Sequence, residues 1–470
     1  MLFLPELTLL GAGLILFIYS LGKPSSGKVK NVAIIVASLT FLASLITVRS
    51  EGTLFFGAYQ VDFFSQVFKV LISLATVIIL VFGDRNGGVK EDTQAEYYMF
   101  LFMSVLGLVM LVSSVELLAI FVSLELSSFA VYIMVPMRNN DTVSGNQIEA
   151  GIKYLLFGVM ATGLMLFGMS YMYGLTGTTN LAGVAAGLST MYTQPAAVIA
   201  IVLVLAGFFY KLAIFPLHFW VPDVYEGASN ETTAFIAAVP KLAAVALLIR
   251  MVTLVSGEGE VVVNILMVCA LLSMFYGNLS ALIQKDVKRL LGFSGISHAG
   301  FVLVGLLTFQ ITGYATAMYY IMGYVFMNLA CFLVICAVSE KGGNVKVEDF
   351  TGLHKRAPLL ALTLTIGLFA LAGIPPFVGF TGKFLLLLGA LKQGHLMLVI
   401  LAALNTGIAI YYYLSIVRVT FCTDSEDRGV VTSSGLNNMI AVLLMVVMVV
   451  MGVMPTRFID MTSAAIQAIM

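Results

Sequence analysis

Apolar segments long enough to cross a bilayer follow one another along almost the whole chain, and they constrain its fold more than any other feature. A bilayer-spanning helix needs about 20 mostly apolar residues. About fourteen segments meet this requirement, and they lie near residues 2–21, 31–49, 62–82, 96–113, 115–135, 150–173, 197–220, 231–255, 261–283, 290–309, 313–338, 358–391, 396–419 and 436–454. The sequence therefore predicts an all-α polytopic membrane protein with about fourteen transmembrane helices.

Composition, charge and cysteines argue against several other classes. The chain has 470 residues, of which 60% are hydrophobic and 10% are charged, a composition that soluble proteins do not have. Its formal net charge is zero, which gives no reason to expect nucleic acid as a partner. The four cysteines lack metal-binding or disulfide spacing. Phosphate-binding loops, HExxH, CxxC and haem-attachment motifs are absent from the sequence, so we expect no metal, no cofactor and no bond chemistry on this chain itself.

The distribution of basic residues predicts how the chain sits in the membrane. Loops numbered from the end of the first segment alternate between many and few Lys and Arg residues, and the even-numbered loops with the C-terminal tail hold only Arg49, Lys392 and Arg457. The positive-inside rule then places the odd-numbered loops in the cytoplasm and both termini outside, which agrees with an even number of spans. The first segment carries Glu6 and lacks a basic leading region, so we interpret it as a retained first span rather than a cleaved signal. A bacterial plasma (inner) membrane is the default expectation for the location of the chain.

Two segments are interrupted by proline and carry a lysine near the break. Lys211 precedes Pro216 in the seventh segment, and Lys383 follows Pro375 and Pro376 in the twelfth. Proline removes a backbone donor and breaks a helix. Corresponding broken helices are typical of transporters with internal repeats, so we predict two inverted repeats of about five helices, each with a proline-broken helix. The predicted units are spans 1–3 in residues 1–90, spans 4–8 in 91–257, spans 9–13 in 258–420 and span 14 in 421–470.

Ionisable side chains inside the segments are the main candidates for function, because a charge at the centre of a span costs at least about 3 kcal/mol on insertion scales. The residues that lie too deep to reach the interface are Glu125, Lys211, Lys241 and Lys383. Lys153 and Arg250 lie near predicted ends, where a long side chain can extend to the interface. Lys69 lies about two turns into its span and is harder to explain in that way.

Glu125 and Lys211 could hold each other in the charged state. Each alone in hydrocarbon would tend to become neutral. At about 4 Å and an effective dielectric constant near 20, their attraction is on the order of 4 kcal/mol. Opening and closing such a pair could therefore load and unload a proton on the lysine. The alternative is a static ion pair that holds two helices together.

Two further lysines extend this pattern along the chain. Lys241 has only Glu231, at the start of its segment, as a nearby acid on the same helix. A buried lysine without an anionic partner can exchange its proton near neutral pH. Lys383 would be the corresponding group of the second repeat, and the tyrosine run 411–413 in the next span could order water beside it or simply pack.

Two histidines could extend a proton route, although each also has a structural interpretation. His218 follows the break in the seventh segment and could relay protons between Lys211 and Lys241, or it could be a hydrogen-bonded packing residue. His298 is expected near the cytoplasmic end of the tenth segment. It could belong to the same route or cap a helix.

Several motifs resemble a known family. They are QIEAGIKYLLFG (147–158), YGLTGTTNL (173–181), FYKLAIFPLHFWVPDVYEGAS (209–229), QKDVKRLLGFSGISHAGF (284–301) and LAGIPPFVGFTGKF (371–384). Together they are similar to the antiporter-like N subunits of respiratory complex I, NADH-quinone oxidoreductase subunit N. The resemblance covers roughly residues 90 to 420 and includes the two broken segments.

The resemblance implies roles for residues that match the family pattern. Its functional acid on span five falls on Glu125, and its lysines on spans seven, eight and twelve fall on Lys211, Lys241 and Lys383. The accessory positions are the histidine after the first break, His218, the GluAlaGlyxxLys pair Glu149 and Lys153, and the acid at the start of span four, Glu96. The implied partners are protons, the lipid bilayer and other membrane-arm subunits of complex I.

The resemblance also implies a mechanism and a division of labour. The chain would relay protons along buried Glu, Lys and His groups, driven by quinone reduction elsewhere in a NADH:quinone oxidoreductase. NADH, FMN, iron–sulfur clusters and quinone would then bind to other subunits. An alternative is a subunit of a multisubunit Na⁺(K⁺)/H⁺ antiporter, because that family shares the fold and several of the lysines. A third possibility is a structural spacer with static ion pairs.

Overall fold

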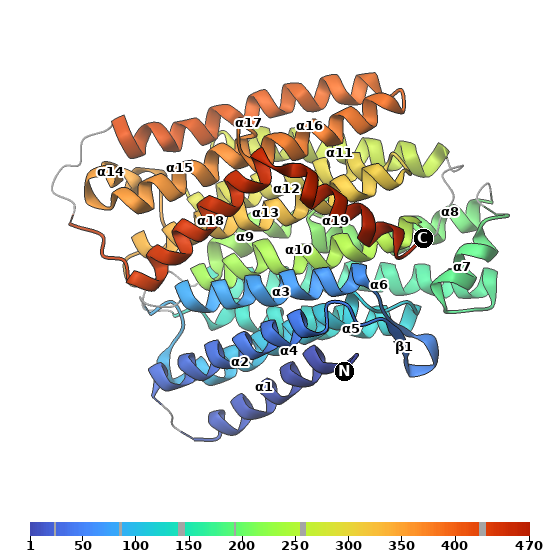
Figure 1. Cartoon of the computed structure of the whole chain (residues 1–470), viewed down its shortest axis with the longest axis horizontal. Helices are drawn as coiled ribbons and strands as arrows, with labels where there is room; N and C mark the ends of the chain where they lie inside the picture. The colour runs from blue at the N-terminus through green and yellow to red at the C-terminus, as the bar shows by residue number, and fades with distance from the viewer. Residues whose placement is uncertain (23–24, 84–86, 140–145, 192–193, 254–259, 423–428) are drawn as a thin grey trace.

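The computed structural model describes residues 1–22, 25–83, 87–139, 146–191, 194–253, 260–422 and 429–470. Figure 1 shows long helices that lie side by side with their axes roughly parallel or antiparallel. The N-terminal helices lie along one side of this bundle and the helices between residues 358 and 422 along the other, with the middle of the chain between them, whereas the two helices after residue 434 cross the middle of the view in Figure 1. The predicted boundary between the two repeats, at residues 257 and 258, lies outside the described residues.

The elements follow one another in this order. The helices are α1 (Leu4–Ser20), α2 (Ser26–Ile46), α3 (Phe63–Phe82), α4 (Gln94–Leu111), α5 (Leu117–Met134), α6 (Asn146–Thr176), α7 (Leu181–Leu188), α8 (Pro195–Leu212), α9 (Trp220–Gly227), α10 (Asn230–Thr253), α11 (Glu260–Ala281), α12 (Val287–Leu306), α13 (Ile311–Val338), α14 (Leu353–Arg356), α15 (Pro358–Ala372), α16 (Val378–Lys392), α17 (Leu396–Cys422), α18 (Gly435–Val453) and α19 (Pro455–Gln467). The short strands β1 (Gly52–Leu54) and β2 (Tyr59–Val61) form an antiparallel pair in which Thr53 lies opposite Gln60.

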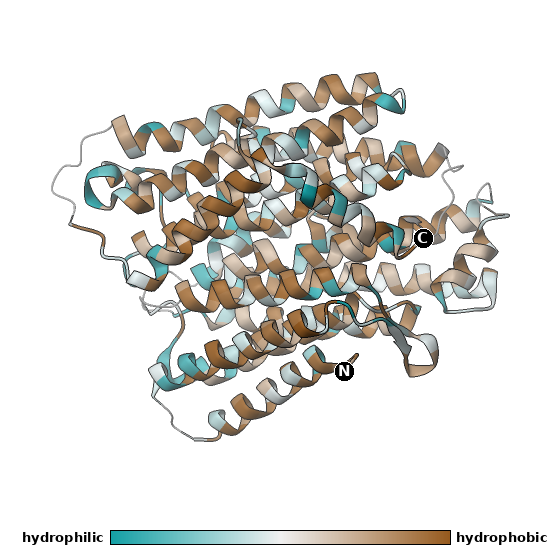
Figure 2. Ribbon diagram, in the orientation of Figure 1, coloured by the Kyte–Doolittle hydropathy of each residue, from teal (hydrophilic) through white to brown (hydrophobic). Residues whose placement is uncertain are grey.

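The prediction of an all-α polytopic membrane protein is confirmed. Within the described residues, 12 helices are long and apolar enough to cross a membrane. The predicted first span corresponds to the shorter helix α1, and the predicted twelfth span corresponds to α15 and α16 together. Apolar residues dominate the ribbons, and polar residues gather at helix ends and loops (Figure 2). The count of fourteen crossings stays a prediction, because α1 and α15 are short.

Both predicted helix breaks are present. α8 ends at Leu212 and α9 begins at Trp220, whereas α15 ends at Ala372 and α16 begins at Val378. Proline explains both interruptions, because its ring cannot continue the hydrogen-bond ladder. Each break leaves the last carbonyl groups of a helix inside the bundle, where they need donors.

The middle helices are the most deeply buried part of the bundle. Within their most apolar windows, 94% of α10 and of α12 is buried, compared with 39% of α2 and of α11 and 33% of α6. α10 and α13 pack against each other, and both contact α12. A charged side chain on these helices must therefore face protein rather than lipid, which is the situation of Lys241 and His298.

Candidate functional site

Lys211 and Glu125 belong to one polar cluster on α5, α6 and α8. Lys211 lies in the last turn of α8, is 3% exposed, and its Nζ donates to Ser128 Oγ on α5 at 2.8 Å. Glu125 lies one turn before Ser128 and accepts from Thr162 Oγ1 on α6 at 2.8 Å. The described residues do not include a Glu125–Lys211 ion pair within 4.0 Å, although the two charges act on each other electrostatically. Each of the two charged groups therefore has a hydroxyl group from another helix as its hydrogen-bond partner.

Lys241 lies inside the bundle and has a hydroxyl partner. It is 2% exposed on α10, and its Nζ donates to Tyr324 Oη on α13 at 3.2 Å. Gly295 on α12 leaves room for the ammonium, because a Cβ built there would lie 2.8 Å from both Lys241 Nζ and Tyr324 Oη. Sequence reasoning missed Gly295 and Tyr324. A tyrosine and a glycine in apolar segments give no signal of their own.

His298 links α12 to two tyrosines on neighbouring helices. Its Nδ1 lies 2.6 Å from Tyr320 Oη on α13, and its Nε2 lies 3.3 Å from Tyr413 Oη on α17. Its ring centroid is 5.0 Å from that of Tyr324, the partner of Lys241. The prediction that His298 lies near the end of its span is wrong, since α12 runs from Val287 to Leu306 and places it near the middle. The option of a helix cap is excluded for the same reason.

Lys383 fills the carbonyl end left by the second break. It lies on α16, is 4% exposed, and its Nζ donates to Leu371 O at 2.9 Å and Ala372 O at 3.1 Å. These carbonyls belong to the last residues of α15. The ammonium also lies 5.1 Å from the ring centroid of Phe301 on α12. Lys241 and Lys383 both act electrostatically on His298, so the three groups form one cluster around α12.

His218 is packed rather than hydrogen-bonded. Its side chain is fully buried, and within the described residues neither ring nitrogen has a hydrogen-bond partner. The ring lies 4.2 Å from the ring of Tyr276 on α11, 4.3 Å from Phe219 and 5.4 Å from Phe215, measured between centroids. The break directs this histidine toward α11, and the structure does not bring it into contact with Lys211 or Lys241.

The predicted accessory pair belongs to a charged network at one end of the bundle. Lys153 Nζ lies 2.7 Å from Glu149 Oε1 and 2.6 Å from Asp223 Oδ2. Arg289 Nη1 then joins Asp223 at 2.8 Å to Glu226 at 2.7 Å. These side chains surround a polar pocket of about 200 Å³. Asp223, Glu226 and Arg289 were missed as partners, because they come from α9 and α12, far from α6 in the sequence.

Three further ionisable residues that the sequence singled out lie outside these clusters. Glu96, in the first turn of α4, has a buried Oε2 without a hydrogen-bond partner among the described residues, and it touches none of the lysine clusters. Arg250 is 4% exposed and forms an ion pair with Asp62 at 2.9 Å, so the prediction that it extends to the interface is wrong. Lys69 pairs with Glu6 at 2.7 Å, and both are fully buried. Opposite charges from α1, α3 and α10 thus satisfy each other internally.

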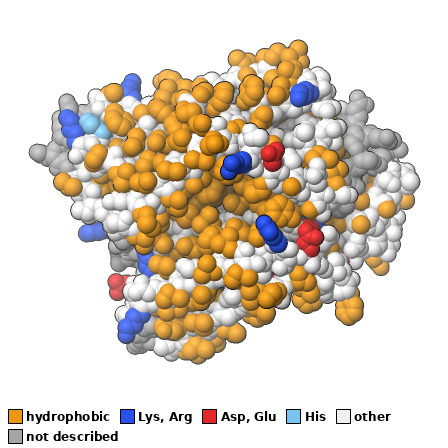
Figure 3. All heavy atoms as spheres, viewed as in Figure 1, with side chains coloured by type: hydrophobic (Ala, Val, Ile, Leu, Met, Phe, Trp, Pro, Cys, Tyr) orange, Lys and Arg blue, Asp and Glu red, His pale blue; other side chains and the backbone are white. Residues whose placement is uncertain are grey.

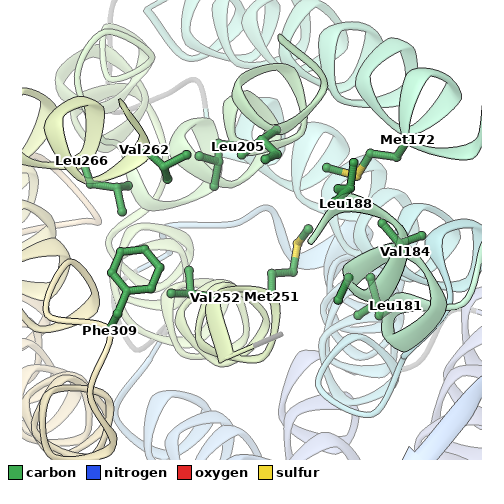
Figure 4. Close-up of a pocket in the computed structure, with 12 residues that line it drawn as sticks. Met172, Leu181, Val184, Leu188, Leu205, Met251, Val252, Val262, Leu266 and Phe309 are labelled. Atoms are coloured by element: carbon green, nitrogen blue, oxygen red, sulfur yellow. The ribbon is translucent and has the colours of Figure 1, made fainter. Parts of the chain in front are cut away.

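One apolar pocket lies between α6, α7, α8, α10 and α11 (Figure 4). Met172, Leu205, Met251, Leu266 and Phe309 are among the side chains around it, and its volume is about 60 Å³. It offers no charged or metal-binding side chain to a cofactor. Within the described part of the chain, no group of three or more His, Cys, Asp or Glu residues could hold a metal ion.

The chain is similar to proteins of one family along nearly its whole length. The family model described as NADH:quinone oxidoreductase/Mrp antiporter, TM, matches residues 114–409. A protein named NADH-quinone oxidoreductase subunit N 2 from Opitutus terrae is 46% identical over 459 residues, covering 97% of this chain and 96% of that one. A protein of the same name from Syntrophobacter fumaroxidans is 40% identical over 472 residues, with 100% and 99% coverage.

Solved structures agree with this similarity. A chain of respiratory complex I from Thermus thermophilus is 28% identical and superposes with a TM-score of 0.84, covering 97% of this chain and 98% of that chain. A chain of the Mrp complex from Dietzia sp. is 22% identical with a TM-score of 0.86, a likeness that concerns the fold alone. The model match and the full-length relatives together establish that this chain belongs to the NADH:quinone oxidoreductase/Mrp antiporter transmembrane family, among relatives named NADH-quinone oxidoreductase subunit N.

Proposed function

We propose that this chain is a proton-translocating membrane-arm subunit of a NADH-quinone oxidoreductase. Relatives at 46% and 40% identity carry the name of subunit N of that enzyme over essentially their full length. Its partners are then the other membrane-arm subunits. NADH, FMN, iron–sulfur clusters and quinone belong to other subunits, whose quinone reduction drives the protons through this one. The alternative of an Na⁺(K⁺)/H⁺ antiporter subunit rests on membership of the broader family and on the shared fold, and none of the full-length relatives named above carries an antiporter name.

The proposed role of the buried lysines depends on one observation: three ammonium groups are buried, and among the described residues none of them has a carboxylate as a hydrogen-bond partner. Lys211, Lys241 and Lys383 are each at most 4% exposed, and their hydrogen-bond acceptors are hydroxyl or carbonyl oxygens rather than carboxylates. A buried lysine held in this way can give up its proton and take it back, whereas a lysine in a tight ion pair stays charged. This arrangement supports proton exchange and speaks against a spacer with static ion pairs at these three positions.

The proposed route runs from Lys211 to Lys241, then through Tyr324 and His298 to Lys383. α8 and α10 pack against each other, and we propose that transient water carries the proton between Lys211 and Lys241. Tyr324 accepts from Lys241 and lies beside the ring of His298, on which Lys383 also acts electrostatically. His298 thus replaces His218 as the relay histidine. We prefer His298 because its two ring nitrogens lie within hydrogen-bond distance of tyrosine hydroxyls, whereas those of His218 have no such partner among the described residues.

We propose that protons enter through the network around Lys153 and Arg289. This network lies where the basic, odd-numbered loops begin, which the positive-inside rule assigns to the cytoplasm. Both termini would then lie outside a bacterial plasma membrane. The test of orientation is the labelling of single cysteines placed at Lys392 and at Lys28 in sealed right-side-out vesicles. An impermeant reagent should label only the first, and labelling of only the second would reverse the assignment.

Replacement of Lys211 by alanine in the intact complex tests the route. We expect coupled quinone reduction and proton translocation in proteoliposomes to fall by at least about tenfold, because the first exchangeable group is lost. Lys28→Ala, at an exposed position on α2, is the matched control and should behave like the wild type. Normal proton stoichiometry in the Lys211→Ala complex would remove Lys211 from the mechanism.

A further inference from the structure

An apolar groove lies between the two parts of the chain that flank the predicted repeats. α2 and α3 form one wall, α18 and α19 form the other, and Met322 and Phe326 of α13 lie at the bottom. The groove has a volume of about 460 Å³, and every side chain that lines it is apolar. Figure 3 shows it as a hollow in the middle of this face, surrounded by hydrophobic side chains. None of the proton-route residues contributes to it.

The position of the groove favours an acyl chain as its occupant. Four of the helices that line it, α2, α3, α13 and α18, are long and apolar enough to span the membrane, and the groove opens on the outer surface of the bundle. In a bilayer, such a surface is in contact with lipid. The side chains around the opening, Leu45, Val446 and Val450, are exposed although they are large and apolar.

Both signs of charge stand at one end of the groove. Arg49 directly follows Val48 of one wall, and Arg457 directly precedes Phe458 of the other, so their Cα atoms lie about 3.8 Å from groove residues. Both arginines are exposed, and neither forms an ion pair within the described residues. Glu51 follows two residues after Arg49, and Asp460 lies one turn after Arg457 on α19; both acids are exposed as well. Figure 3 shows basic and acidic side chains next to each other beside the hollow.

This charge pattern selects among phospholipids. A guanidinium group binds phosphate oxygens through two parallel hydrogen bonds. A carboxylate beside it accepts from a primary ammonium group. A phosphatidylethanolamine head group carries both a phosphate and a primary ammonium, whereas phosphatidylglycerol lacks the ammonium and phosphatidylcholine cannot donate hydrogen bonds from its methylated nitrogen.

We propose that the groove binds one phosphatidylethanolamine molecule. One of its two acyl chains lies between α2–α3 and α18–α19, its phosphate binds Arg49 and Arg457, and its ammonium binds Glu51 or Asp460. The lipid joins the first three helices to the C-terminal helices across α13. The proposal is independent of the proton route, since it uses none of the same residues.

The test compares lipids retained by the purified complex. Complexes are equilibrated in nanodiscs with equal parts of phosphatidylethanolamine, phosphatidylglycerol and phosphatidylcholine, washed in detergent, and the bound lipids are quantified by mass spectrometry. Arg49→Gln with Arg457→Gln should lower retained phosphatidylethanolamine at this site by at least about tenfold, because charge-assisted hydrogen bonds are lost. Lys392→Gln removes the other basic residue predicted on this side and should leave retention unchanged.

A second pair of variants distinguishes a selective site from a general apolar surface. Glu51→Gln with Asp460→Asn removes the acceptors of the ammonium, so retention should shift from phosphatidylethanolamine to phosphatidylglycerol. Val450→Trp fills the groove and should lower the retention of all three lipids. Equal retention in the wild type and the double arginine variant would overturn the proposal. So would a helix of a neighbouring subunit that cross-links to a cysteine placed at Val450.

Discussion

At the end of α8 and again at the end of α15, the chain leaves a helix through a left-handed residue and then reaches a proline. Ala213 has φ 63° and Gly373 has φ 86°. In both places the following isoleucine N–H bonds the carbonyl five residues earlier, Ile214 to Phe209 at 2.8 Å and Ile374 to Phe369 at 3.0 Å. This is the Schellman arrangement of a helix end. Two segments of different sequence thus end their helices with the same backbone conformation.

The lysines stand on opposite sides of these two breaks. Lys211 precedes Ala213 on α8 and reaches a side-chain hydroxyl of another helix, Ser128. Lys383 lies on α16, after Gly373 and the break, and its Nζ donates to carbonyl groups at the end of α15. The first lysine is therefore held by neighbouring helices, and the second is held by its own broken helix. This difference predicts that the second lysine matters more for stability.

The helices beside the breaks correspond as well. A Cβ at Gly107 on α4 would lie 2.6 Å from Ser127 N on α5, and a Cβ at Gly277 on α11 would lie 2.8 Å from Ser297 N on α12. Each glycine allows its helix to approach the backbone of the next one closely. These matched contacts support the predicted repeat of spans 4–8 by spans 9–13.

Counting from these serines reveals what differs between the two units. Glu125 lies two residues before Ser127, and Gly295 lies two residues before Ser297. The second unit thus has a glycine, Gly295, where the first unit has the acid. A Cβ built on this glycine would lie 2.8 Å from Lys241 Nζ. Similarly, His298 occupies the position that Ser128 has in the first unit. The first unit places Glu125 near its Lys211, whereas the second places His298 where both its own Lys383 and Lys241 of the first unit act on it electrostatically.

The largest effects are expected when the lysines of the two breaks, Lys383 and Lys211, are replaced. Lys383→Met should abolish proton translocation and also destabilise the complex, because the carbonyls of Leu371 and Ala372 lose their donor at about 1–3 kcal/mol each. Lys211→Met should abolish translocation with little loss of stability, since Ser128 keeps its bond to Leu124 O. Thermal denaturation of the purified complexes measures the difference. Equal destabilisation would show that both lysines are held in the same way.

A second substitution strains the end of α15. Gly373→Ala should destabilise the complex by about 1–2 kcal/mol, because an alanine in the left-handed region is strained. It should also reduce proton translocation, since its Cβ would lie 3.1 Å from Lys383 Cδ. Gly394→Ala is the matched control: it has a similar φ of 85° and no atom within 4 Å of the added Cβ. If Gly394→Ala reduces translocation equally, strain alone explains the effect.

A third substitution fills the position beside Lys241. Gly295→Ala should reduce proton translocation several-fold while leaving stability nearly unchanged, because the loss of contact with Tyr324 is offset by an alanine gain of about 0.5–1 kcal/mol in a helix interior. Gly163→Ala on α6, where the added Cβ meets nothing within 4 Å, should only gain stability. Proteoliposome pumping and thermal denaturation of both variants test this. Wild-type pumping by Gly295→Ala would argue that Lys241 needs no fixed position.

The features that sequence predicted correctly are local ones. Hydropathy predicted the long apolar helices, and proline predicted both breaks. A helix is interrupted wherever its own residues cannot continue the backbone hydrogen bonds. The pairings were missed for the opposite reason. Arg250 was assigned to the interface, but Asp62 lies 188 residues away in sequence and meets it only after α3 and α10 have packed.

The two histidines show the same limit at the candidate site. Both stand in apolar segments near a lysine or a break, and spacing favoured His218 as the relay. Packing reverses that preference, because tyrosines from α13 and α17 surround His298, whereas aromatic rings close around His218. The C-terminal helix α19 was also missed, since its mixed polar and apolar residues give no continuous apolar segment.

The smallest expected effect returns to the first break. Ala213→Gly should stabilise the complex slightly, by at most about 1 kcal/mol, because glycine adopts φ 63° without the strain that alanine carries. Proton translocation should not change, since the substitution removes only a methyl group and leaves the Lys211–Ser128 hydrogen bond in place. Thermal denaturation of the Ala213→Gly and Gly373→Ala complexes compares the two reciprocal substitutions at the left-handed position of each break. A gain of stability in Ala213→Gly and a loss in Gly373→Ala would show that strain of the same left-handed conformation affects the stability of both breaks. A loss of stability in Ala213→Gly would instead show that packing of the alanine methyl group, which is fully buried, outweighs the backbone strain.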